Sequence, residues 1–436
     1  MPFNNKDGTG IALSSLFHDW PKERLAQICS PSGEIAPDTN ICETYYRLGT
    51  KELRRAFPLA AYGRLRRFAV GRGVGAAMAT GGGAPQSTQS APPSQMAARV
   101  RAAMHARGWL YPVDSRLSAG LKKFLDDFAP DLIFSVPAEY ALVRLTRQIA
   151  SYLHIPIAAQ VYDNWMPMHY RKGLMAERKR RRLDHELRAL FDCAALRFGI
   201  SEIMCEAYGA MFDQPFLPLS VPVDVDLWHR PLGERVQGSG SLSIVYAGTI
   251  HQHAAYAGLA DMSRVVEMLN RAGMAVKFSI IGSVAANESQ IGELGGEFTE
   301  FVCLPERKDL IERVGRADLL FLPVAFDAES RQFIKYSLPA KSAAYMASGT
   351  PILVYAPADV PISMEAVRHG FAHVVSEADI DQLASATSHL LSDAPARAGI
   401  SAAAVRRAKE HYDMKAESIR VRRLFYDAIG QTGGRA

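Results

Sequence analysis

Hydrophobic and polar positions follow a repeated rhythm in the first half of the chain. Short apolar runs occupy 130–136, 155–163 and 193–201, and stretches with helical apolar spacing occupy 117–128, 139–153 and 202–212. Short strands that alternate with amphipathic helices are typical of βαβ units, which build parallel sheets. The pattern therefore predicts an α/β domain with a parallel sheet.

The same rhythm starts again in the second half. Apolar runs predict strands at 242–248, 276–282, 299–305, 317–324, 351–356 and 372–377, with helices at 256–272, at 307–314 and after Ser337. The proline-rich segment 215–228 lies between the two series, and we interpret it as an interdomain connection.

The predicted fold class is α/β, with two doubly wound domains in tandem. The expected limits are 1–225 for the first domain and 226–412 for the second, with a helix in 413–436 that packs back on the first domain. Such domains bind ligands at the carboxyl ends of their strands, so we expect an interdomain cleft there. Residues 71–95 are rich in Gly, Ala, Ser and Pro, and this composition predicts a mobile insertion.

Composition and charge narrow the functional classes. The chain has 436 residues, five scattered cysteines and no apolar run near the roughly 20 residues of a spanning helix, so we expect a cytoplasmic protein. The net charge is +5 but uneven. Basic residues in 177–188 alternate with leucines and are interpreted as a solvated helix face. Arginines in 54–68 alternate with aromatic residues, which predicts peripheral contact with the inner face of the membrane.

Candidate chemistry lies at predicted strand ends of the second half. Ser337 would cap the next helix, so the amides of Ala340 and Lys341, the helix dipole and an ammonium could together hold a diphosphate. Small residues for close backbone approach, together with possible hydrogen-bonding side chains, follow two of the predicted strands: Gly248, Thr249, His251, Gly282 and Ser283.

Each of these features also has a simpler interpretation. A glycine at a strand end is commonly part of a turn, His251 could be an exposed loop residue, and Lys341 could lie along a helix surface. Asp224 and Asp226 have the spacing of a metal-diphosphate pair, but they lie in the proline-rich segment and not at a strand end. We therefore expect no metal site.

A group of residues from 339 to 351 resembles the signature of the group 1, family-4-like retaining glycosyltransferases of the glycosyltransferase-B fold. The matching residues are Pro339, Lys341, Tyr345, Met346, Ala347, Gly349 and Pro351. In the first half, 162–171 is similar to the family's sugar-facing loop, 197–208 to the strand and helix after it, and 8–28 to its glycine loop and first helix.

The resemblance implies two Rossmann-like domains and a hexosyltransferase-type enzyme that needs neither a metal nor a cofactor. It would move a sugar, with retention, from a nucleoside diphosphate sugar to a glycan or lipid-linked acceptor, in polysaccharide or glycolipid biosynthesis; no nucleic-acid partner is expected. Leu304, Pro305 and Glu306 would face the base. Asp163, Asn164 and His169 would orient the sugar or the acceptor hydroxyl, and Gly8, Thr9 and Gly10 would lie on the acceptor side.

Several positions depart from the family pattern. Two glutamates of the family fall on Tyr336 and Ala344, and a usual arginine falls on Thr249. A non-catalytic partner or scaffold subunit is therefore an alternative, and a nucleotide-sugar epimerase on the same fold is a third. The fold also calls for a strand before Gly8, so we predict that the central strand of the first sheet is missing from this sequence.

Overall fold

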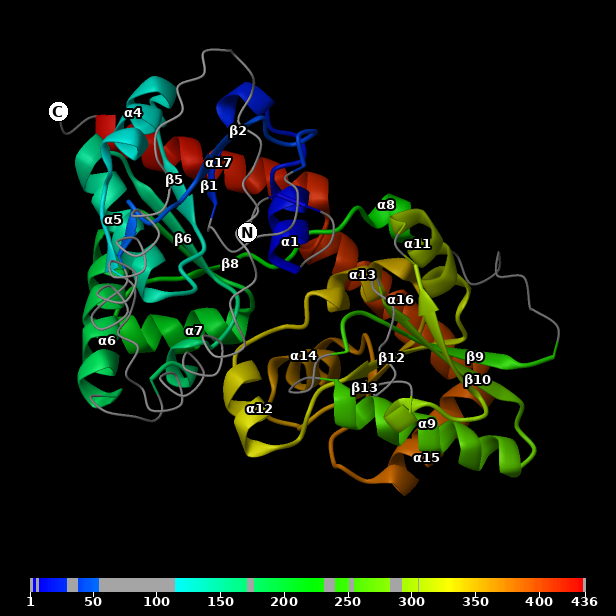
Figure 1. Cartoon of the computed structure of the whole chain (residues 1–436). Coiled ribbons are helices and arrows are strands. Elements are labelled where there is room, and N and C mark those ends of the chain that lie inside the picture. The colour runs from blue at the N-terminus through cyan, green and yellow to red at the C-terminus, as the bar shows by residue number, and fades with distance from the viewer. Residues whose placement is uncertain are drawn as a thin grey trace, which may run out of the picture.

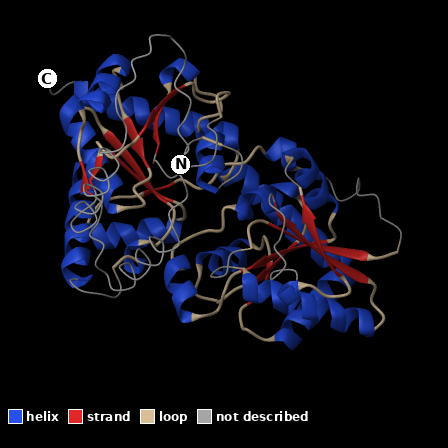
Figure 2. Cartoon of the chain, in the orientation of Figure 1, coloured by secondary structure: helices blue, strands red, loops and turns tan. Residues whose placement is uncertain are grey.

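The structure is a computed structural model that describes residues 3–4, 8–29, 38–54, 114–170, 176–230, 240–250, 255–282, 292–304 and 306–433. The predicted insertion at 71–95 and residues 55–68 of the predicted membrane stretch lie outside the described residues. The described chain forms two α/β domains that lie side by side (Figure 1), each with strands between helices (Figure 2).

The first domain is built mainly on parallel strands. In its described part, β5 (Ile133–Ser135), β6 (Ile157–Val161), β7 (Leu196–Gly199) and β8 (Leu217–Pro218) form one parallel sheet in that order. A separate parallel pair is made by β1 (Ala26–Cys29) and β2 (Thr44–Arg47), and an antiparallel pair by β3 (Leu53–Arg54) and β4 (Asp114–Ser115). Around them lie α1 (Gly8–Leu16), α4 (Ala119–Phe128), α5 (Tyr140–Leu153), α6 (Ala176–Cys193), α7 (Glu202–Phe212) and the 3-10 turns η1 (Lys22–Arg24) and η2 (Met166–Met168).

The second domain contains one larger parallel sheet. Its described strands are ordered β11 (Thr299–Cys303), β10 (Val276–Gly282), β9 (Leu242–Ala247), β12 (Leu319–Pro323), β13 (Ile352–Tyr355) and β14 (His373–Val375). Its helices are α9 (Tyr256–Arg271), α11 (Arg307–Arg316), α12 (Ala328–Ile334), α13 (Lys341–Ser348), α14 (Pro361–His369), α15 (Ile380–Ser392) and α16 (Ala394–His411).

The central strand β9 shows why the second sheet is covered on both faces. Ile244 and Tyr246 face an apolar cluster that includes residues of α9 and α15, whereas Val245 and Ala247 face a cluster that includes residues of α13 and α16. All four side chains are buried. Burial of each large apolar side chain contributes about 1.5–3 kcal/mol, so the uninterrupted apolar run stabilises a central parallel strand.

Helix α17 (Met414–Gly433) returns to the first domain, as Figure 1 shows. Its Val421 and Phe425 are buried in one cluster with Phe17, which follows α1. Arg420 also donates a hydrogen bond to the carbonyl of Pro218, at 2.7 Å. The last described helix of the chain is therefore part of the first domain's core.

One prediction of secondary structure was wrong. Segment 8–28 was expected to form a glycine loop and a helix, but α1 ends at Leu16, and Pro21, with ψ of 127°, is followed by η1 and then β1. Segment 215–228, predicted as the interdomain connection, runs from β8 of the first sheet to the short helix α8 (Val225–Trp228), which packs on α13 of the second domain. The predicted missing strand stays a prediction: among the described strands, β1 and β2 are not paired with the β5–β8 sheet.

Candidate functional site

The strand order of the second sheet indicates where a ligand would bind. β9 is the first strand of this domain, and the order reverses between β9 and β12. Open parallel sheets bind ligands in the crevice outside the carboxyl ends of the strands at such a switch point. β9 ends at Ala247 and is followed by Gly248 and Thr249. These residues are therefore the centre of the candidate site.

Lys341 places its amine at this strand end. It is the first residue of α13, and Ala340 occupies the N-cap position. Its Nζ lies 2.6 Å from the hydroxyl of Tyr246 and 3.9 Å from the centre of the Tyr246 ring. The helix thus brings a cation-forming side chain to the switch point of the sheet.

Gly248 permits this close approach. A Cβ atom at position 248 would lie 2.5 Å from Nζ and 2.9 Å from Cε of Lys341, well inside van der Waals contact. The N–H of Gly248 donates to the carbonyl of Ile281 at 2.9 Å, which fixes the backbone against β10. A side chain at this position would therefore displace the amine.

Two tyrosines hold the turn after β9. The hydroxyl of Tyr246 donates to the carbonyl of Thr249 at 2.7 Å, and the hydroxyl of Tyr345 accepts the N–H of Ala247 at 2.7 Å. Both tyrosines are buried. Burial raises the pKa of both phenols, so they stay protonated and neutral.

The environment of Lys341 disfavours its charged form. Burial of the amine lowers the pKa of Lys341 from 10.5 to about 7. An anionic ligand beside the amine would restore the charged form, because opposite charges raise the pKa of a lysine. The site is therefore suited to an anion that arrives with its own negative charge.

The other predicted donor residues lie on neighbouring strand ends. Gly282 ends β10, and its carbonyl accepts the N–H of Leu304 at 2.9 Å. Glu306 is exposed and occupies the N-cap position of α11. His251, Ser283 and Pro305 lie outside the described residues.

Ser337 does not cap α13, contrary to the prediction. Its N–H donates to the carbonyl of Ile334 at 2.9 Å, and the helical turn starts only at Pro339, whose carbonyl accepts the N–H of Ser342 at 2.9 Å. The Ser337 hydroxyl instead donates to the carbonyl of Phe333 at 3.4 Å. Ser337 also lies beside the carboxyl group of Asp163 in the first domain, and burial raises the pKa of that carboxyl group.

Residues at strand ends of the first domain hold the segment that leads into α13. Asn164 donates through Nδ2 to the carbonyl of Gln332 at 2.9 Å. The Ser201 hydroxyl donates to the carbonyl of Tyr336 at 2.9 Å. These two hydrogen bonds join the two domains directly upstream of Lys341.

The remaining predicted residues of the first domain make other contacts. The His169 ring packs edge-on against Trp165, with ring centres 5.1 Å apart. The predicted glycine loop is instead the first turn of α1, formed by Gly8, Thr9 and Gly10. A Cβ at Gly10 would lie 1.9 Å from Nδ2 of Asn4, so this glycine permits close packing of the chain onto the helix.

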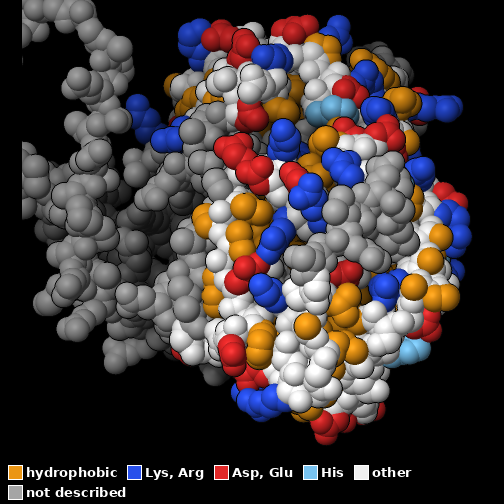
Figure 3. Space-filling view, turned by 90° about the vertical axis from the view of Figure 1, so that its right-hand side faces the viewer, with side chains coloured by type: hydrophobic (Ala, Val, Ile, Leu, Met, Phe, Trp, Pro, Cys, Tyr) orange, Lys and Arg blue, Asp and Glu red, His pale blue; other side chains and the backbone are white. Residues whose placement is uncertain are grey.

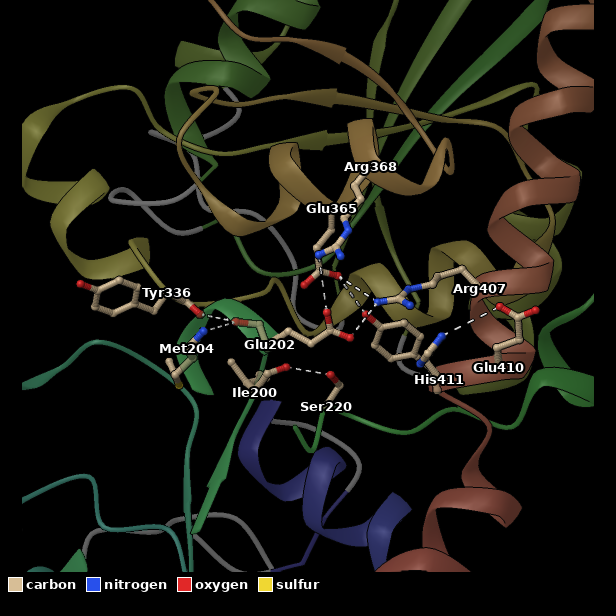
Figure 4. Close-up of polar contacts among 12 residues, drawn as sticks. Ile200, Glu202, Met204, Ser220, Tyr336, Glu365, Arg368, Arg407, Glu410 and His411 are labelled. Atoms are coloured by element: carbon tan, nitrogen blue, oxygen red, sulfur yellow. Dashed lines mark hydrogen bonds and ion pairs between the residues drawn. The ribbon is translucent and has the colours of Figure 1, made fainter. Parts of the chain in front are cut away.

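A cluster of charged side chains also joins the two domains (Figure 4). Arg407 of α16 lies 3.8 Å from Glu202 of α7 and 3.8 Å from Glu365 of α14, and Arg368 lies 3.9 Å from Glu202. Burial raises the pKa of Glu365 to about 7, although the charge of Arg407 acts in the opposite direction. Tyr412 donates to Glu365 at 3.4 Å. The domain contact thus contains one buried carboxyl group, that of Glu365, whose pKa lies near neutral pH.

Tyr336 and Ala344 occupy the two positions at which the resembled family carries glutamates. Tyr336 packs edge-on against Tyr208 of the first domain, with ring centres 6.1 Å apart, and Lys335 Nζ lies 5.2 Å from the centre of the Tyr336 ring. Ala344 is partly exposed on α13, three residues after Lys341. Tyr336 therefore belongs to the domain contact, and Ala344 leaves the face beside Lys341 unoccupied by a long side chain.

The Asp224 and Asp226 pair has other partners. Asp224 caps α8 by accepting the N–H of Leu227 at 3.0 Å, and Asp226 lies 3.4 Å from Lys415 Nζ. Within the described ranges, no group of three or more His, Cys, Asp or Glu side chains is arranged to hold a metal ion.

The described surface gives no support to the predicted membrane contact (Figure 3). None of the described helices is long and apolar enough to cross a membrane. On the end of the second domain seen in Figure 3, basic and acidic side chains are interspersed. The membrane stretch at 54–68 is described only at Arg54, so the predicted contact stays a prediction.

Two residues that support the predicted ones, Tyr246 and Ser201, were not predicted from the sequence. Tyr246 stands two residues before Gly248 and therefore shares its face of the strand, a spacing that could have identified it. Tyr345, which was named only as part of the family signature, stands four residues after Lys341 on the same helix face. No local pattern indicates Ser201, whose partner is more than a hundred residues away in sequence.

Comparisons with known proteins agree with this geometry. The family profile "Glycosyl transferases group 1" matches residues 241–393. None of the curated proteins matches the chain.

Solved structures share the two-domain architecture. Sucrose-phosphate synthase from Thermosynechococcus elongatus is similar with a TM-score of 0.55 and 12% identity, over 71% of this chain and 76% of that one. Anabaena HepE in complex with UDP and glucose has a TM-score of 0.53 and 14% identity, over 71% and 82%. Trehalose 6-phosphate synthase from Burkholderia multivorans has a TM-score of 0.53 and 10% identity, over 76% and 81%. Residues 241–393 of the second domain thus match the group 1 glycosyltransferase profile, and the chain has the glycosyltransferase-B fold.

Proposed function

We propose that this protein is a glycosyltransferase that moves a hexose from a nucleoside diphosphate sugar to an acceptor hydroxyl. The observation that carries the proposal is the position of the Lys341 amine, beside Gly248 at the switch point of the second sheet. This is where the fold binds ligands and where a diphosphate needs a positive charge.

On the donor side, the reaction depends more on stabilising the negative charge of the leaving diphosphate than on a side chain that donates or accepts a proton. The acceptor oxygen bonds to the anomeric carbon as the bond from that carbon to the diphosphate oxygen breaks, and the hydroxyl proton passes to the departing diphosphate or to water. Negative charge develops on the diphosphate oxygen as it leaves. An ammonium placed in a partly buried site stabilises that charge without reorganisation. Lys341, the backbone amide of Ala340 and the turn at Gly248 and Thr249 would hold the leaving group, so the proposed reaction needs no metal and no cofactor.

The choice of donor nucleotide rests on one structure of similar fold and on the residues at the strand ends of the second domain. HepE, which is similar in fold, is recorded in complex with UDP and glucose. On this proposal the base lies near Leu304 and Glu306, which follow β11 on the same edge of the sheet as Gly282. UDP is therefore the first nucleotide to test.

The acceptor side is proposed to lie at the strand ends of the first domain. Asp163, Asn164 and His169 would orient the sugar or the acceptor hydroxyl once the contact of Asp163 and Asn164 with the second domain opens. We propose transfer with retention to a glycan or lipid-linked acceptor, in polysaccharide or glycolipid synthesis at the inner face of the membrane. The basis for these finer points is the family resemblance.

A scaffold role is a second candidate, and one observation favours it. Asn164 donates to the carbonyl of Gln332 and Asp163 lies beside Ser337, so both side chains contact the segment before α13. A scaffold would keep this arrangement closed, whereas an enzyme must open it to admit a sugar.

Calorimetric titration of UDP and of GDP without metal tests the proposal. We expect micromolar binding of one nucleotide, weakened at least about tenfold in Lys341→Ala, a loss of about 1.4 kcal/mol. Lys277→Ala is the matched control, since this exposed lysine lies at the opposite end of the same sheet. Slow release of the nucleotide from the matching UDP- or GDP-sugar would then separate an enzyme from a scaffold, and absence of binding to any nucleoside diphosphate would overturn the donor site.

A further inference from the structure

We propose that Tyr246 is a positioning residue of the donor site, whose hydroxyl links the phosphate-binding amine of Lys341 to the turn at Gly248 and Thr249. This inference rests on the donor site proposed above. It adds a residue that no family pattern indicated here, and it assigns a direction to each hydrogen bond around the amine.

The direction follows from the single proton of the phenol. Tyr246 donates that proton to the carbonyl of Thr249 at 2.7 Å. Its oxygen can therefore only accept from Lys341, whose Nζ is 2.6 Å away. A lysine amine always has protons to donate, so this arrangement is satisfied in both of its charge states. One N–H of Lys341 is committed to Tyr246, and the others remain available for a ligand.

The position of the amine is restricted on two further sides. Nζ lies 3.9 Å from the centre of the Tyr246 ring, and a cation is favoured over the face of such a ring. The backbone of Gly248 lies so close that a Cβ there would be 2.5 Å from Nζ. Because Tyr246 and Gly248 share one face of β9, the strand presents acceptor, ring and open backbone to the same amine.

The titratable groups around the amine are neutral partners. Among the described residues these are Tyr246 from β9 and, beside it, Tyr345 from α13, and burial keeps both protonated. Burial without a carboxylate partner in the described chain lowers the pKa of Lys341 to about 7. When a diphosphate binds above neutral pH, Lys341 should therefore take up a proton. The Tyr246 hydroxyl, which accepts a hydrogen bond from the amine, should favour this uptake.

A titration without ligand tests the link between the two residues. The rate at which an amine-selective reagent modifies Lys341 would be measured against pH by peptide mass spectrometry. In Tyr246→Phe the midpoint should fall by at least about half a pH unit, because the ammonium loses its acceptor while the apolar ring remains. Tyr345→Phe is the matched control, since it removes a buried hydroxyl that bonds the backbone of Ala247 and not Lys341.

The two possible contrary results have separate meanings. An unchanged midpoint in Tyr246→Phe would show that the hydroxyl does not support the amine. A midpoint that rises toward the ordinary lysine value would show that Tyr246 only excludes water. Either result overturns the positioning role, and a fall in Tyr345→Phe of the same size would overturn its specificity.

A second measurement connects this role with the proposed function. UDP would be titrated into wild type and Tyr246→Phe at pH 6 and pH 8, in two buffers with different ionisation enthalpies. We expect proton uptake on binding at pH 8 in the wild type, and an affinity loss in Tyr246→Phe of about threefold or more at pH 8 that shrinks at pH 6. An equal loss at both pH values would indicate general distortion and would contradict the inference. If neither UDP nor any other nucleoside diphosphate binds the wild type, the donor site fails, while the ligand-free titration still decides the link of Tyr246 with Lys341.

Discussion

Replacement of Lys341 by methionine should stabilise the folded protein at neutral pH while it removes nucleotide binding. Burial lowers the pKa of this lysine from 10.5 to about 7. Between these values the unfolded chain binds the proton more tightly, so the wild type should become more stable as the pH rises from about 7 to 10.5. Methionine fills a similar volume and carries no charge.

The size of the effect follows from the two pKa values. Keeping the amine buried costs the folded state at most roughly 4 kcal/mol at pH 7 and roughly 1.4 kcal/mol at about pH 9.5. The variant also loses the hydrogen bond and the ring contact with Tyr246, each worth about 1 kcal/mol. Lys341→Met should therefore be about 2 kcal/mol more stable than the wild type at pH 7 and no more stable than it at about pH 9.5.

Urea unfolding followed by circular dichroism at both pH values measures this difference. Lys277→Met is the control, because its lysine is exposed on β10 and should change the stability by no more than about 0.5 kcal/mol. A variant less stable than the wild type at pH 7, or a difference that does not depend on pH, would refute the reasoning that the amine is buried without a counter-charge.

Three further perturbations probe the same structure. Gly248→Ala places a Cβ 2.5 Å from Lys341 Nζ, so UDP affinity should fall about tenfold by calorimetry, whereas Gly292→Ala, with nothing within 4 Å, should bind normally. Burial raises the pKa of the Glu365 carboxyl to about 7, so the wild type should lose at most about 3 kcal/mol of stability as the pH rises from about 4.5 to 7. Glu365→Gln should not show this loss. Urea midpoints at pH 5 and pH 8 that differ equally in both proteins would disprove the prediction. Phe425→Ala should cost about 3–5 kcal/mol in urea unfolding, since this side chain is 2% exposed among Phe17, Trp20 and Phe134; a cost below about 1 kcal/mol would mean that α17 does not support the first domain.

Local sequence patterns predicted most of the second domain. Its strands lie within the apolar runs expected for them, and β9 ends next to Gly248 as the run 242–248 indicated. The first-domain helix expected at 202–212 has these limits in the structure, because Ser201 caps it by accepting the N–H of Met204. Such features depend on neighbours in sequence, so the sequence reveals them.

The errors arose where distant residues decide the structure. Ser337 has the chemistry of a helix cap, but it lies in the domain contact beside Asp163 of the first domain, and the helix begins after Pro339. Residues 26–28 were placed at the end of a helix, but they belong to β1, because residues 26–29 pair in parallel with 44–47. Neither partner is adjacent in sequence, so periodicity and turn chemistry could not predict these contacts.

The positions of the domain contact and of the donor site imply that they are mechanically linked. The carbonyl of Tyr336 accepts a hydrogen bond from Ser201 of the first domain, and Ser337 lies beside Asp163. Helix α13 begins at Lys341, a few residues later. Proline at 339 limits the freedom of the short segment between them. Any rotation that separates the first domain from residues 336–337 must therefore act on the N-terminal end of α13, where the amine meets Tyr246. In a protein that must separate its domains to admit a sugar, the same movement would shift the Lys341 amine and so change its contact with the diphosphate.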